Sequence, residues 1–94
     1  MFLVESERTE EARSALVEAT SILRAAGAPD PAELGRAETN LAHVLGVLGR
    51  HGEGLEHARE GLRLLESAPE ARPQDLARAR AVQDGLETAA TRKE

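Results

Sequence analysis

The sequence predicts an all-α protein of about four helices, arranged as antiparallel helical hairpins in a single domain over residues 1–94. Three observations predict this fold class. Apolar residues recur at steps of three and four along most of the chain, which is the period of an amphipathic helix. Proline and glycine punctuate the chain at intervals that suit helix starts and ends. No segment alternates with period two or is rich in β-branched residues, so a sheet is not expected.

The first helix is expected over about residues 6–26. Ser6 has the side chain of an N-cap, and three glutamates follow it in the first turn, where the helix dipole favours negative charge. Gly27 suits a left-handed C-cap, and Pro29 prevents the helix from continuing. The predicted inward stripe is Ala12, Ala15, Leu16, Ala19, Ile22, Leu23 and Ala26.

The second helix has the clearest start signal in the chain. Asp30 offers an acceptor at the N-cap, Pro31 is suited to the first helical position, and Glu33 completes a capping box. The helix is expected over about residues 31–48, with Gly49 ending it. Its predicted inward residues are Leu34, Ala37, Leu41, Val44, Leu45 and Leu48.

The third and fourth helices are expected over about residues 53–67 and 73–89. A turn as short as residues 50–52 forces the second and third helices into an antiparallel hairpin. Pro73 starts the fourth helix as Pro31 starts the second. The predicted inward residues are Leu55, Ala58, Leu62 and Leu65 in the third helix, and Leu76, Ala79, Val82 and Leu86 in the fourth.

Two glycines lie seven residues apart on one face of the third helix. Gly54 and Gly61 would let the second helix approach closely, at a cost of about 1 kcal/mol each against alanine. The alternative is that they only make the third helix looser and less stable.

The chain contains an internal repeat of helix boundaries. Sliding the sequence along itself by 42 residues places Pro31 on Pro73 and keeps the helix boundaries in step. A fixed period of this length indicates a repeat architecture. The other matches are Glu11 with Glu53, Glu18 with Glu60, Leu23 with Leu65, Ala26 with Ala68, Leu34 with Leu76, Arg36 with Arg78 and Ala37 with Ala79. The alternative is a chance alignment of helices that have similar compositions.

The segment from Asn40 to Glu66 carries a recognisable pattern of small and apolar positions. They are Leu41, Ala42, Leu45, the turn Leu48-Gly49-Arg50, and then Gly54, Ala58, Gly61 and Leu62. This segment resembles a tetratricopeptide repeat, in particular the longer kinesin-light-chain-like variety. The resemblance implies one complete helical hairpin, with the first helix as the second half of a preceding unit and the fourth as the start of a following unit, in a right-handed superhelix. Departures are Glu38 and Leu45 at usual aromatic sites, glycines 54 and 61 at usual alanine sites, and Glu66 in place of the closing proline.

Composition excludes several classes of function. The net charge is −5 without a basic stripe, and Phe2 is the only aromatic residue, so nucleic-acid binding is not expected. No apolar run approaches the roughly 18 residues of a membrane span, and no signal peptide is expected. The chain has no cysteine, which fits a reducing cytoplasm. Its basic residues are almost all arginine, which is typical of a GC-rich bacterial gene.

No catalytic or metal site is expected from the sequence, and no cofactor. The three histidines are His43, His51 and His57, and no pair has the spacing that brings two imidazoles together on one helix. His43 and His57 could approach across the hairpin, but no acidic third ligand is implied. Carboxylates are spread through exposed Glu-Arg faces; Glu60 and Arg63 have the spacing of a surface ion pair.

The resemblance implies a concave groove lined mainly by the second helix. Its candidate residues for a peptide or partner are Arg36, Thr39, Asn40, His43 and Val47, continued by Arg78 on the fourth helix. The Asn40 amide offers a donor and an acceptor to an extended backbone. Arginines can clamp carboxylates in a bidentate way. The alternative is that Arg36 and Arg78 are ordinary solvated helix residues.

Three functions follow, in decreasing order of support. The first is a protein–protein interaction module, part of a larger bacterial regulatory or signalling protein, that binds a peptide or partner protein in the groove. The second is a structural self-association unit, because a truncated solenoid exposes apolar edges that another copy can cover. The remote alternative is a metal-binding or catalytic helical protein built around the histidines.

Overall fold

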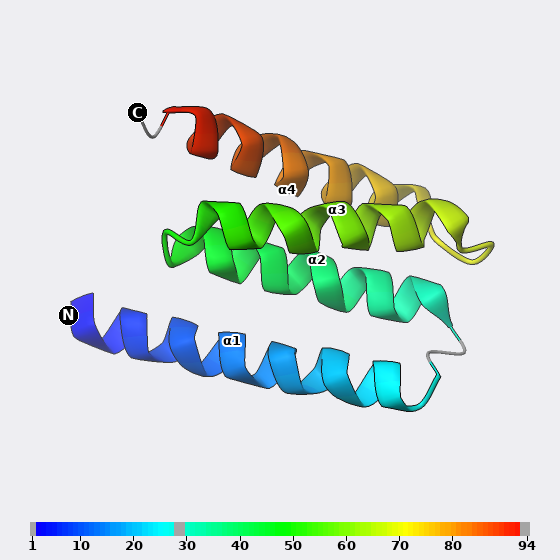
Figure 1. The fold of residues 1–94 in the computed structure, drawn as a ribbon, viewed down its shortest axis with the longest axis horizontal. Helices are drawn as coiled ribbons and strands as arrows, with labels where there is room; N and C mark the ends of the chain where they lie inside the picture. Colours follow the sequence, from blue (N-terminus) through cyan, green and yellow to red (C-terminus); the bar gives the residue numbers. More distant parts are fainter. Residues whose placement is uncertain (1, 28–29, 93–94) are drawn as a thin grey trace.

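The computed structural model describes residues 2–27 and 30–92, with side chains from residue 7 onward. This part of the chain forms four helices, α1 (Phe2–Ala25), α2 (Pro31–Val47), α3 (His51–Ser67) and α4 (Pro73–Arg92), and contains no strand. Consecutive helices run in opposite directions, as Figure 1 shows. The predicted all-α hairpin fold is therefore confirmed.

The prolines that start the second and fourth helices and the Asp30 cap are confirmed, whereas the capping-box role of Glu33 stays a prediction. Helix α2 begins at Pro31, and Asp30 caps it by accepting a hydrogen bond from the Ala32 backbone N–H at 3.0 Å. Helix α4 begins at Pro73 and continues to Arg92, beyond the predicted end at residue 89. Helix α3 begins at His51, two positions before the predicted start at Glu53.

Two glycines end helices as predicted. Gly27 has φ 86° and Gly49 has φ 84°, so both occupy the left-handed region that favours glycine after a helix. The predicted helix stop at Pro29 lies outside the described residues.

The predicted cap at Ser6 is wrong. Helix α1 begins at Phe2, so Ser6 lies inside the helix. The chain before Ser6 contains no proline or glycine, so nothing in the sequence interrupts the helix there.

The predicted inward stripe of α1 is also wrong in part. Leu16, Ala19 and Leu23 are half-buried, but Ala12, Ala15 and Ala26 are exposed, and Ile22 is 60% exposed. Thr20 is the one buried residue among residues 7–25 of this helix. Among the described residues, α2 is the helix against which α1 packs, and α2 covers the edge of the apolar face of α1 and leaves the middle open.

The core lies between α2, α3 and α4. Helix α2 contacts α3 and α4, and α3 contacts α4. One apolar cluster is centred on Ala32, Leu65 and Ala79, and a second on Ala42, Ala58 and Leu86. Among residues 7–27, α1 contributes no buried apolar side chain. The predicted inward residues of α2, α3 and α4 are all buried or half-buried.

The two glycines of α3 bring α2 into close contact. A Cβ at Gly61 would lie 3.0 Å from the Gly35 carbonyl oxygen, and one at Gly54 would lie 3.0 Å from the Ala42 carbonyl oxygen. Backbone atoms this close leave no room for a methyl group. The predicted close approach is confirmed, and the alternative of a merely looser helix is not needed.

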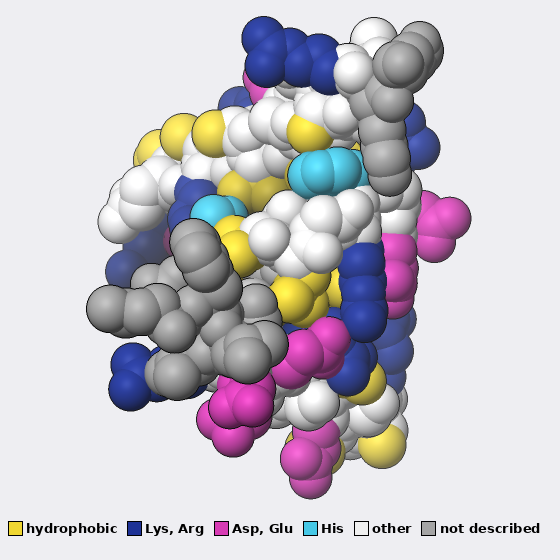
Figure 2. All heavy atoms as spheres, turned by 90° about the vertical axis from the view of Figure 1, so that its left-hand side faces the viewer, with side chains coloured by type: hydrophobic (Ala, Val, Ile, Leu, Met, Phe, Trp, Pro, Cys, Tyr) yellow, Lys and Arg dark blue, Asp and Glu magenta, His cyan; other side chains and the backbone are white. Residues whose placement is uncertain are grey.

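Charge is distributed unevenly over the described surface. In Figure 2, acidic side chains gather mainly in the lower half of the molecule, over α1, whereas basic side chains are spread from its top to its lower half. Within residues 2–27 and 30–92, none of the helices combines the length and apolar character that a bilayer crossing requires.

Candidate binding groove

One face of α2 carries most of the predicted binding residues. Arg36, Asn40, His43 and Val47 follow one another at helical steps of four, three and four, so they share this face. Helix α4 lies alongside α2 and contacts it, and Arg78 projects from its first half. The two helices therefore form the two walls of a groove.

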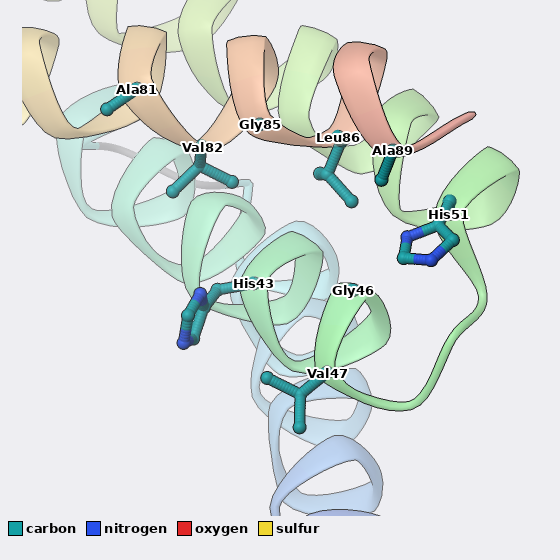
Figure 3. A pocket seen from close by; sticks show the side chains of 9 residues that line it. All are labelled: His43, Gly46, Val47, His51, Ala81, Val82, Gly85, Leu86 and Ala89. Atoms are coloured by element: carbon teal, nitrogen blue, oxygen red, sulfur yellow. The ribbon is translucent and has the colours of Figure 1, made fainter. Parts of the chain in front are cut away.

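An apolar hollow of about 310 Å³ forms one end of the groove. Figure 3 shows Val82, Leu86 and Ala89 on α4 facing the last turns of α2, with His51 near Ala89. Leu86 packs closely on Gly46, because a Cβ at Gly46 would lie 3.0 Å from Leu86 Cδ2. The hollow is lined by His43, Gly46, Val47, His51, Ala81, Val82, Gly85, Leu86 and Ala89.

A smaller polar cavity of about 80 Å³ forms the other end. It is lined by Arg36, Thr39, Asn40, Leu65, Asp75 and Arg78. The structure thus divides the six predicted residues into two groups. Four lie at the polar end, and His43 and Val47 lie at the apolar hollow.

The two groove arginines differ in their surroundings. Arg36 donates to Asp75 Oδ2 at 3.3 Å, which joins α2 to the first turn of α4. Arg78 is exposed, and no hydrogen bond or ion pair joins it to another described residue. Arg78 is therefore the cation that a ligand meets without first breaking an ion pair, whereas Arg36 holds the two walls together.

Thr39 and Asn40 also differ. The Thr39 side chain is buried, and its hydroxyl donates to the Gly35 carbonyl oxygen at 2.9 Å. Asn40 is exposed, and it lines the polar cavity together with Arg78. Thr39 therefore packs the α2–α3 hairpin, and its contact with a partner stays a prediction.

Sequence reasoning missed the α4 wall of the apolar hollow, and it also missed His51. The 42-residue repeat could have predicted this wall. A shift of 42 residues aligns the predicted groove residues of α2 with residues of α4: Asn40 with Val82, His43 with Gly85 and Val47 with Ala89. His51 shows no such signal. Its Nδ1 is buried without a hydrogen-bond partner among the described residues. A hydrogen-bonding group on a ligand could satisfy this atom.

A buried carboxylate away from the groove was missed as well. The Glu38 side chain is 3% exposed; Arg24 of α1 donates to its Oε2 at 2.6 Å, and its Oε1 lies 2.6 Å from His57 Nδ1 of α3. The hydrogen bond to Glu38 raises the pKa of Arg24 above its ordinary value. Glu38 is thus a charged junction between three helices.

The histidines do not assemble into a metal site in the part of the chain that the structure describes. His57 is engaged with Glu38, whereas His43 lines the apolar hollow. Among the described residues, no group of three or more histidine and acidic side chains is placed to hold a metal ion.

Comparison with known proteins adds no relative. No protein-family model matches the sequence, and neither a curated protein nor a solved structure matches it. The function has to be argued from the groove itself.

Proposed function

We propose that this chain is a protein–protein interaction module of the tetratricopeptide type, which binds an extended segment of a partner protein in the groove between α2 and α4. The observation that supports this proposal is the apolar hollow of about 310 Å³ between α2 and α4, whose two helices also carry the exposed Asn40 and the exposed Arg78, which has no ion pair among the described residues. Ligand sites commonly combine apolar walls with a few polar groups, in volumes of about 300–1,000 Å³.

The length of the groove suits a short extended peptide. Arg36 and Val47 mark its two ends on α2, which are about 16 Å apart at 1.5 Å per residue. An extended chain rises about 3.3 Å per residue, so about five residues span the groove. An apolar side chain would occupy the hollow, and the Asn40 amide would bond the peptide backbone.

The lining chemistry favours binding over catalysis. The two cavities contain no serine, cysteine or lysine among their lining residues, and their one carboxylate, Asp75, is paired with Arg36. Small residues at Gly46, Ala81 and Gly85 instead leave space for a ligand side chain.

The experiment begins with selection of binding peptides from a displayed random library on the wild-type protein. Their affinity is then measured by calorimetry for wild type and variants. Gly85→Leu should occupy the hollow, and a Cβ at Gly85 meets nothing within 4 Å. We expect it to weaken binding by about 100-fold, which corresponds to about 2.7 kcal/mol. Asn40→Ala should weaken binding by about tenfold, through one lost hydrogen bond.

The matched control is Ser21→Leu, a small-to-large change at an exposed position of α1. It should leave peptide affinity unchanged. Equal affinity in Gly85→Leu and wild type would remove the groove assignment, and so would failure of the library to yield any binder.

A further inference from the structure

Helix α1 adds no described residue to the two apolar clusters of the core. Both clusters consist of residues from α2, α3, α4 and the connection between α3 and α4. Among the described residues, the backbone of α1 lies against α2 but not against α3 or α4, and Figure 1 shows it at the edge of the molecule. The packing of these clusters therefore does not depend on the described part of α1.

Three ion pairs tie α1 to the α2–α3 hairpin. Arg24 lies 2.6 Å from Glu38 of α2 and 3.6 Å from Glu60 of α3, and Glu10 pairs at 3.1 Å with Arg50, which precedes α3. The Glu38 side chain is 3% exposed, whereas the side chains of Glu60, Glu10 and Arg50 are 30–44% exposed. Exposed ion pairs contribute little to stability, so the pair of Arg24 with Glu38 is the main polar tie of α1.

The apolar part of the contact between α1 and α2 is uneven. On α2, Leu34 and Leu41 share the face of Glu38 and are buried. On α1, Leu16 and Leu23 are only half-buried. Most of the stability of a helix in a protein comes from the packing of its apolar face, and α1 buries less of this face than α2 buries of its own.

Departure of α1 would leave no buried charge without a partner. Arg24 donates to Oε2 of Glu38, whereas Oε1 of the same carboxylate lies 2.6 Å from His57 Nδ1. His57 belongs to α3, so this contact stays when α1 leaves, and Oε2 then faces water in the space that α1 vacates. A buried charge that loses every partner is strongly destabilising, and this arrangement avoids that cost. The start of α2 also stays, because its cap comes from Asp30, outside α1.

We propose that α1 is a detachable helix, held by the charge contact of Arg24 with Glu38, and that it opens as one unit while α2, α3 and α4 stay folded. Opening exposes the α2 face of Leu34 and Leu41. This face lies away from the groove, because Glu38 and Asn40 are about 200° apart around the helix at 3.6 residues per turn. The groove stays assembled in the open form, so the inference does not rest on peptide binding.

The test is native-state hydrogen exchange of the whole chain, read amide by amide by NMR. The slowest amides of α1 should exchange more than about tenfold faster than the slowest amides of α2, α3 and α4, relative to an unstructured chain. Equal protection in all four helices would overturn the proposal, because α1 would then open only when the whole molecule unfolds.

Leu76→Ala distinguishes opening of α1 from unfolding of the whole molecule. Leu76 packs against the first apolar cluster and lies in α4, which α1 does not contact among the described residues. Its truncation destabilises α2, α3 and α4 whether α1 is closed or open. Exchange in these three helices should therefore speed up by about tenfold, while exchange in α1 changes by less than about twofold. A tenfold increase in α1 as well would overturn the proposal.

Arg24→Gln tests the charge contact. It removes the ion pairs with Glu38 and Glu60 and should speed exchange in α1 by about tenfold. The matched control Arg8→Gln makes the same change at an exposed position of α1 that has no ion pair with another described residue, and it should leave exchange unchanged. Equal exchange of α1 in these two variants would overturn the proposal. Peptides selected on the groove should bind Arg24→Gln as tightly as the wild type, so this inference and the proposed function fail separately.

Discussion

Nδ1 of His57 on α3 lies 2.6 Å from Oε1 of Glu38 on α2, inside the contact between the two helices of the hairpin. The other carboxylate oxygen of Glu38 accepts a hydrogen bond from Arg24 of α1. This single side chain therefore links three helices. It matters most for α1, because among residues 7–27 that helix buries no apolar side chain.

Loss of the Glu38 charge should destabilise the fold. Glu38→Gln keeps the shape of the side chain but weakens its hydrogen bonds with Arg24 and His57. We expect a loss of about 1–3 kcal/mol in the free energy of unfolding, measured by urea denaturation. The control Glu56→Gln changes an exposed glutamate and should stay within about 0.5 kcal/mol of wild type. Equal stability of the two variants would show that the junction contributes nothing.

Two glycine-to-alanine substitutions should have opposite signs. Alanine favours a helix interior over glycine by about 1 kcal/mol. At Gly85 the new Cβ meets nothing within 4 Å, so Gly85→Ala should raise the melting temperature. At Gly61 it would lie 3.0 Å from the Gly35 carbonyl oxygen and 3.1 Å from the Thr39 backbone nitrogen. Overpacking there should outweigh the helix preference, so Gly61→Ala should lose about 1–3 kcal/mol. Stabilisation by both substitutions would contradict the close contact of α2 and α3.

Acid should reduce the stability that Glu60 contributes through its ion pairs with Arg63 and Arg24. The hydrogen bond from Arg63 holds the pKa of Glu60 below its ordinary value of 4.5, and the charges of Arg63 and Arg24 act in the same direction. The stabilisation by Glu60 is therefore fully present above pH 4.5 and is lost as the pH falls through the lowered folded value. Solvent screening limits it to a few tenths of a kcal/mol.

The measurement for this acid effect is urea denaturation of wild type and Glu60→Gln at neutral pH and at about pH 3. The wild type should lose more stability than the variant between these two conditions. An identical loss would mean that Glu60 does not contribute to the pH dependence.

The start of α2 should depend on the cap at Asp30. Asp30→Ala removes the acceptor of the Ala32 N–H and should cost about 1 kcal/mol in thermal or urea unfolding. Asp30→Asn keeps an acceptor with a similar capping preference and should remain within a few tenths of a kcal/mol of wild type. Equal losses in both variants would point to the negative charge rather than the hydrogen bond.

Local signals predicted α2, α3 and α4 well. Pro31 and Pro73 start helices and Gly49 ends one through local backbone geometry. These helix boundaries can therefore be predicted without knowing which other helix packs nearby. The apolar stripe of α1 was predicted less well for a physical reason. Periodicity tells which residues share a face, but it does not tell whether another helix covers that face. Ala12, Ala15 and Ile22 do share a face, and in this molecule α2 covers only its edge.

The candidate groove could be predicted on its α2 side and at Arg78, but not along the rest of its α4 wall. Arg36, Asn40 and His43 have helical spacing, but the small residues of α4 become a wall only when α4 packs against α2. Glu38 was missed because its burial depends on Arg24 and His57, which are distant in the sequence. Spacing along the chain contains no information on such pairings between helices.

The most direct test of the binding account is amide chemical-shift mapping by NMR with a library-selected peptide. The account predicts that the largest shifts fall on the groove face of α2, from Arg36 to Val47, and on α4 around Gly85, while the exposed face of α1 is unaffected. Largest shifts on α1, or shifts that persist in Gly85→Leu at the same peptide concentration, would contradict a binding groove between α2 and α4.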